Sequence, residues 1–128
     1  MLLARSRGGK PAQALTEFAL VITILMMVVL GIVDLGRGVY SYNVLASAAR
    51  EGARYGIAHG GTSNLTGIKN RVQATATLNI DPNKIVVSCP GGCTRGDPLT
   101  VIVQYVFVPA TPLFTSLTMT GQTTMTME

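Results

Sequence analysis

Few side chains in this sequence could carry out catalysis, and they are spread along the chain. Its 128 residues include a single histidine, His59, two cysteines and six acidic residues. There is no GxxxxGK[ST] phosphate-binding loop, no GxSxG nucleophile motif and no HExxH zinc motif. Catalysis requires several reactive groups in one place, so we expect neither enzyme activity nor a cofactor.

The two cysteines are four residues apart. Cys89 and Cys93 bracket Pro90-Gly91-Gly92, a sequence typical of a tight turn. In an oxidising compartment they would close a small disulfide loop, which is the pairing we predict. Two free thiols remain an alternative. Zinc is disfavoured because two cysteines and one histidine do not supply four ligands.

Glu17 stands at the start of a long apolar run. From Phe18 to Val33 there is no charge, and Thr23 is the one polar side chain. With its apolar flanks, the run reaches the roughly 20 residues that a helix needs to cross a bilayer. We therefore predict a membrane span at about 14–35, in contact with lipid. An ionised carboxylate at the edge of hydrocarbon is costly unless it is compensated, so Glu17 is a candidate functional residue.

Basic side chains are concentrated before this run. Arg5, Arg7 and Lys10 precede it, and the seven remaining basic residues of the ten nearly balance the six acidic ones. The basic excess is thus a flank and not a nucleic-acid-binding face. Positive charge before a first span favours a cytoplasmic N-terminus. We predict a disordered cytoplasmic leader over 1–12 and a single-pass protein of the cytoplasmic membrane with its C-terminal domain outside.

The helix is expected to continue beyond the membrane. No strong breaker occurs before Gly60-Gly61, so a helix over 13–58 would be about 70 Å long, and its half over 36–58 would stand outside. In that half, Ala48, Gly52 and Gly56 form a small-xxx-small series that allows close approach of another backbone. Packing on the chain's own sheet and helix packing between subunits both remain open.

Charged pairs occur at helical spacing along this element. Asp34 and Arg37 lie three residues apart at the outer end of the span. We predict a helix-surface ion pair that marks the membrane interface. Glu51 and Arg54 are expected to form a similar pair.

Residues 59–128 are expected to form an extracytoplasmic head with one short helix and three strands. Leu65, Ile68, Val72 and Ala76 fall on one helical face. Strands are predicted at 84–89, 99–108 and 117–128; the second is apolar on both faces and should be central. The predicted fold is α+β: a long N-terminal transmembrane helix continuing into a small antiparallel β-sheet domain.

Three segments carry a family resemblance: QALTEFALV over 13–21, LGIVDLGR over 30–37 and AAREGAR over 48–54. Together they resemble the TadE-like family of the tight-adherence (Flp-type) pilus systems, a branch of the type IV pilin-like proteins. The resemblance implies a pilin-like fold and a leader cut by a prepilin peptidase. It also implies two kinds of partner, which are other pilin-like subunits and an inner-membrane pilus assembly platform.

The resemblance also implies roles for residues at the start of the helix. Glutamate is the fifth residue of the mature chain in this family, which places the cut between Ala12 and Gln13, although glycine usually precedes the cut. The new amino group on Gln13 would lie one helical turn from Glu17. Glu17, followed by Phe18, is then implied to set subunit register during assembly. Alternatively, Glu17 reaches toward lipid headgroups as a charge at the helix N-terminus.

These observations favour a non-enzymatic pilin-like subunit or minor pseudopilin. The main filament subunit of a cell-surface pilus and a membrane-anchored envelope-binding module are alternatives. A secreted domain released at the A-x-A site of Ala46-Ser47-Ala48 is disfavoured, because that cut would destroy the long helix.

Overall fold

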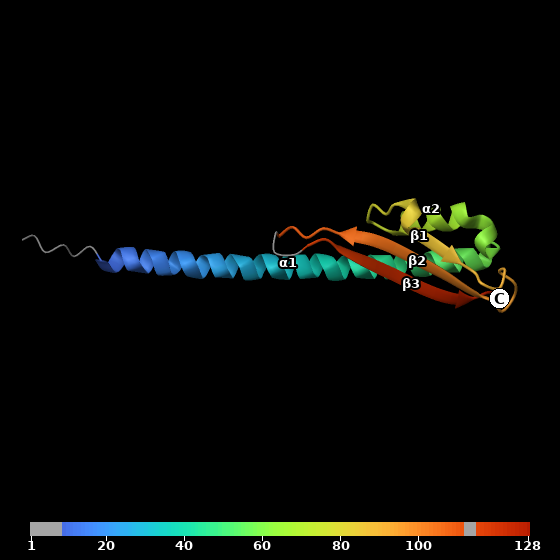
Figure 1. Cartoon of the computed structure of the whole chain (residues 1–128), viewed down its shortest axis with the longest axis horizontal. Helices are drawn as coiled ribbons and strands as arrows, with labels where there is room; N and C mark the ends of the chain where they lie inside the picture. The colour runs from blue at the N-terminus through green and yellow to red at the C-terminus, as the bar shows by residue number, and fades with distance from the viewer. Residues whose placement is uncertain (1–8, 112–114) are drawn as a thin grey trace, which may run out of the picture.

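One long helix dominates the molecule. A computed structural model describes residues 9–111 and 115–128, and its first element is α1 (Gly9–Ala58), a continuous helix of 50 residues (Figure 1). It begins four residues before the predicted start, so residues 9–12 of the expected leader are helical, while residues 1–8 lie outside the described chain. Pro11 is tolerated there because the first N–H groups of a helix have no intrahelical partner.

The remaining elements form a small head on the C-terminal half of α1. In chain order they are η1 (Gly61–Asn64), α2 (Leu65–Thr75), η2 (Pro82–Lys84), β1 (Ile85–Ser88), β2 (Pro98–Phe107) and β3 (Leu117–Thr126). The strands form an antiparallel sheet in the order β1-β2-β3. This confirms the predicted α+β architecture and the central position of the most apolar strand.

Alternation along the strands determines which face of the sheet is buried. In β2, Leu99, Val101 and Val103 are fully buried beneath the helices. In β3, Thr118, Thr120 and Gln122 are exposed, so this strand turns a polar face outward. The period of two residues therefore produces a sheet that is covered by helix on one side.

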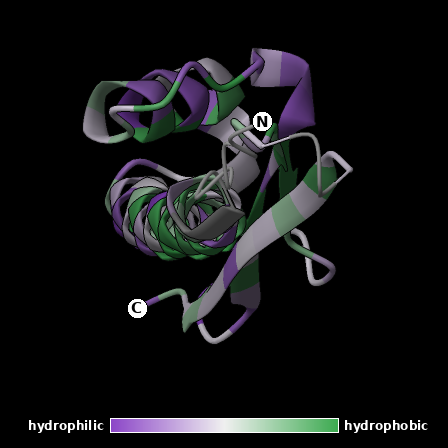
Figure 2. Cartoon of the chain, turned by 90° about the vertical axis from the view of Figure 1, so that its left-hand side faces the viewer, coloured by the Kyte–Doolittle hydropathy of each residue, from purple (hydrophilic) through white to green (hydrophobic). Residues whose placement is uncertain are grey.

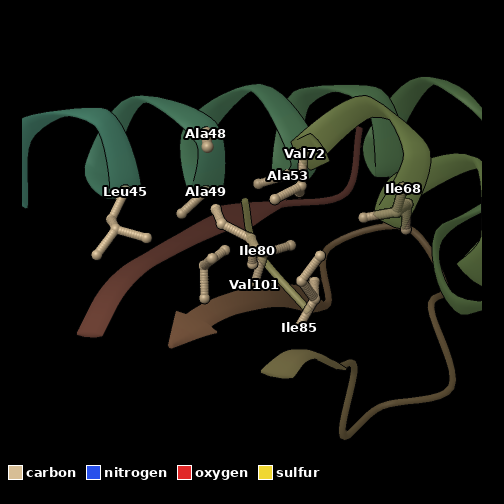
Figure 3. Packing of buried hydrophobic residues seen from close by; sticks show 10 residues of the cluster. Leu45, Ala48, Ala49, Ala53, Ile68, Val72, Ile80, Ile85 and Val101 are labelled. Carbon is tan, nitrogen blue, oxygen red and sulfur yellow. The ribbon is translucent and has the colours of Figure 1, made fainter. Parts of the chain in front are cut away.

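Small residues on α1 allow its close approach to the head (Figure 3). A Cβ added at Gly52 would lie 2.4 Å from Cγ2 of Val72 on α2, and one added at Gly56 would lie 2.6 Å from Cδ2 of Leu99. With the buried Ala48, these glycines thus pack on the chain's own α2 and β2, the first of the two interpretations left open above. The core cluster comprises Leu45, Ala48, Ala49, Ala53, Ile68, Val72, Ile80, Ile85, Val101 and Val103.

The N-terminal half of α1 projects away from the head. Nearly every residue from 11 to 33 is exposed, and in the end-on view much of the helix ribbon has the green of hydrophobic residues (Figure 2). Within the described residues, α1 is the one helix long and apolar enough to cross a membrane. The head thus covers only one half of an unbroken rod.

Gly121 of β3 provides a test of how tightly the rod and the sheet are joined. A Cβ there would lie 2.7 Å from the backbone carbonyl carbon of Leu45, which cannot move without displacing α1. Gly121→Ala should therefore destabilise the head by about 1–3 kcal/mol, the usual range for overpacking. Thermal unfolding in detergent, followed by circular dichroism, would measure the loss.

The matched control for this test is Gly36→Ala. A Cβ at Gly36 meets nothing within 4 Å, so the change should be neutral or stabilise α1 by about 0.5–1 kcal/mol. Equal melting temperatures for the two variants would contradict the close approach.

Candidate functional site

Glu17 lies on the exposed half of α1, far from the head. The Nε2 atom of Gln13 donates a hydrogen bond to its Oε1 atom at 3.2 Å, and Phe18 beside it is also exposed. In the described part of the chain, this is the one hydrogen bond found for the carboxylate. Glu17 and Phe18 are therefore presented to whatever surrounds the helix.

The predicted cleavage position lies inside the first turns of α1. Ala12 and Gln13 are both helical and exposed. A peptidase binds an extended chain, so the helix would have to open here before a cut. Gly9 and Pro11 lower the cost of opening because both are poor helix formers.

Asp34 holds the connection between β2 and β3 against α1. The backbone N–H of Ala110 donates to Oδ1 at 2.9 Å, and the N–H of Thr111 donates to Oδ2 at 2.9 Å. The Thr111 hydroxyl donates to the same Oδ2 at 2.5 Å. Asp34 is 4% exposed, and these three donors compensate the burial of its carboxylate.

The predicted pair between Asp34 and Arg37 is therefore secondary. The Arg37 Nη1 atom lies 3.5 Å from Asp34 Oδ1, while its guanidinium is about half exposed and lies 5.7 Å from the centroid of the Phe107 ring. A long contact with an exposed guanidinium contributes little. Asp34 is also not on the helix surface, because the head covers it. Sequence reasoning missed Ala110 and Thr111 because nothing local links them to a residue more than 70 positions earlier.

Glu51 also has a different partner from the one predicted. The Arg71 Nη2 and Nε atoms donate to Glu51 Oε1 at 2.6 and 3.0 Å. The expected partner, Arg54, lies on the same helix, whereas Arg71 lies on α2. The ion pair thus joins two helices instead of stabilising a single helix surface.

Cys89 and Cys93 are free thiols in this structure, and the disulfide between them stays a prediction. The Gly92 N–H donates to the Cys89 carbonyl at 3.2 Å, which closes the turn between them. The Thr62 N–H donates to Cys93 Sγ at 3.3 Å. Among the described residues, no group of three or more metal-ligating side chains occurs.

The environment differentiates the two thiols. A hydrogen bond to Cys93, with burial, raises the pKa of Cys89 to about 11. Burial also raises the pKa of Cys93, but hydrogen bonds from Cys89 and Thr62 to its sulfur outweigh that effect and leave the pKa below its usual value. Cys93 therefore carries the larger thiolate fraction at any pH below about 11.

Asp34→Asn tests the attachment at the base of the head. The carboxamide keeps one acceptor oxygen, so donors from Ala110 and Thr111 lose a partner, at a cost of about 1.5–3 kcal/mol for bonds to a charged group. Faster hydrogen exchange at both amides would report the change. Arg37→Gln is the control and should cost less than about 1 kcal/mol. An equal effect of the two substitutions would mean that the ion pair dominates after all.

Limited alkylation tests the difference between the thiols. In the reduced protein at pH 8, iodoacetamide should modify Cys93 before Cys89, because the thiolate is the reacting form. Thr62→Val should slow labelling of Cys93, since loss of the hydroxyl raises the pKa of this thiol toward its ordinary value. Thr100→Val, which removes a hydroxyl contact to Thr124 on the sheet, should change neither rate. Peptide mass spectrometry would measure both; labelling of Cys89 first would refute the assignment.

Comparison with known proteins supports the resemblance in the N-terminal part of the chain. A search of curated proteins found no match, and a search of solved structures likewise found none. Residues 12–54 match the family model described as TadE-like protein. The matched segment contains Glu17, Asp34 and most of the helix face that packs on the head. The N-terminal segment of this chain, with its helix of membrane-spanning length, is therefore similar to that of TadE-like proteins.

Proposed function

We propose that this protein is a non-enzymatic, pilin-like subunit that acts in a tight-adherence pilus as a minor pseudopilin. The TadE-like match supports a pilus-associated, pilin-like role, and proteins of this kind are structural rather than enzymatic. The observation that carries the proposal is the bare apolar half of α1, with Glu17 near its start. A helix that the chain itself leaves uncovered needs lipid or other helices around it.

The proposed topology places residues 14–35 in the cytoplasmic membrane and the head outside. Arg5, Arg7 and Lys10 before the span favour a cytoplasmic N-terminus. In the exterior, the adjacent thiols of Cys89 and Cys93 would oxidise to the disulfide predicted above. Lipid would surround α1 before assembly, and neighbouring pilin-like helices would surround it afterwards.

The role proposed for Glu17 depends on an amino group that a cut after Ala12 would create. N–H groups at the start of a helix point away along its axis, so an α-amino group on Gln13 would be directed beyond its own helix. A neighbour displaced along the axis can bring its Glu17 carboxylate to that group. In low dielectric, opposite charges in contact offset the cost of their burial.

The proposed partners follow from these steps. A prepilin peptidase would make the cut, and an inner-membrane assembly platform would bring subunits together. A main filament subunit of the same pilus would have the same helix and the same pairing. The ratio of this chain to other subunits in purified filaments decides between the main and the minor role.

Glu17→Gln tests the pairing in the native host. The change leaves a neighbour's ammonium buried without a counter-charge, which costs about 3–5 kcal/mol for a broken buried pair. Recovery of the protein with pilus components should fall at least tenfold, as measured by quantitative blotting of sheared or affinity-purified assemblies. Thr23→Val is the matched control: among the residues that the structure describes, the Thr23 hydroxyl bonds only the Ala19 carbonyl within α1, so recovery should not change.

The same preparations report whether the chain is processed. N-terminal sequencing should begin at Gln13. Undiminished recovery of the Glu17→Gln protein, or a native chain that retains residues 1–12 in the assembly, would contradict the proposed pairing.

A further inference from the structure

The base of the head lies at the level where the predicted span ends. The Asp34 carboxylate holds Ala110 and Thr111 against α1, and Asp34 is next to the last residue of the span. Figure 1 shows residues 108–111 after β2 and residues 115–116 before β3 running along α1, past the end of the sheet, toward the projecting half of the helix. These described residues are therefore the part of the head closest to the end of the predicted span.

Apolar side chains are exposed at this level. Val108 after β2 is 64% exposed and Leu117 at the start of β3 is 59% exposed. Leu35 and Val39 are also mostly exposed, one helical turn apart on α1. We call these four residues the collar. Leu35, Val39 and Leu117 line a hollow of about 640 Å³, and Asp34, already hydrogen-bonded, is the one charged residue among the described residues around it.

Three observations favour lipid over protein as the partner of the collar. It is continuous with the apolar span, since Leu35 ends that span. Val39 lies four residues further, about 6 Å along the axis, which is within the headgroup layer. Arg37, Tyr40 and Tyr42 are exposed beside it, and such side chains are typical of membrane interfaces, where cationic groups meet lipid phosphates and tyrosines span the boundary.

We infer that the collar is embedded in the interfacial layer of the outer leaflet, so that the head rests on the bilayer. This contact gives the protein a second attachment to lipid and limits the tilt of α1. The inference depends on the membrane anchoring in the proposed function, and it does not depend on the pilus role.

Single-tryptophan variants test the inference, because the chain contains no tryptophan. Val108→Trp in the full chain would be placed in phosphatidylcholine–phosphatidylglycerol vesicles with bromine at different depths of the acyl chains. Its fluorescence should be quenched several-fold more by shallow bromine than by deep bromine. Leu117→Trp, also on the collar, should behave in the same way and guards against a local distortion at Val108.

Two control positions define the scale. Val86 on β1 pairs with Ile102, and the neighbouring Val101 packs near Gly52 of α1. Gly52 lies about 25 Å beyond Leu35 along the helix axis. The fluorescence of Val86→Trp should therefore show no quenching. Ile24→Trp, near the middle of the span, should be quenched most by deep bromine.

The outcomes separate the two levels of the proposal. No quenching at Ile24 would overturn the anchoring itself, and with it the inference. Quenching at Ile24, with both collar positions no more quenched than Val86, would overturn the collar alone. Blue-shifted collar emission without bromine quenching would also overturn it, because a second protein copy would then cover the collar. Shallow quenching at both collar positions would support it.

Discussion

Asp34 accepts three hydrogen bonds from Ala110 and Thr111, and this buried carboxylate fixes where the head meets the rod. A charge at 4% exposure would be strongly unfavourable without such donors. The two amides in turn lie in a connection that has no strand partner there, so they need an acceptor. The carboxylate and the two amides thus satisfy each other's hydrogen-bonding requirement. Everything further along α1 can pack on the sheet because this point holds the lower edge of the head in place.

Beyond Asp34, steric fit replaces hydrogen bonding as the constraint. Gly52 and Gly56 admit Val72 and Leu99, and Gly121 admits the backbone of Leu45. Side chains at these positions would hold the helix away from the sheet and from α2. The small residues of AAREGAR therefore have a role within one chain, and the face that carries them is occupied. Any contact with another subunit would have to use a different surface, and the bare half of α1 is the largest apolar one described.

Local patterns predicted most of the fold. The apolar run, the alternation of β3 and the apolar character of β2 are properties of neighbouring residues, and the strands begin and end within two residues of the predicted positions. Partners across the fold were not predictable in this way. Glu51 bonds Arg71 instead of Arg54, and Asp34 bonds a connection more than 70 residues away. Helical spacing indicates which residues can meet on one helix, whereas tertiary packing decides which of the possible contacts forms.

The stiffness of α1 links its two halves. Gly31, Gly36 and Gly38 weaken the helix around Asp34, since glycine in a helix interior costs about 0.5–1 kcal/mol relative to alanine. The head braces this region: Asp34 is tied to Ala110 and Thr111, and a Cβ at Gly38 would touch the side chain of Met119 at 3.5 Å. No proline follows Pro11 in α1. Because the helix is unbroken, fixing the position of Glu17 also fixes the orientation of the head.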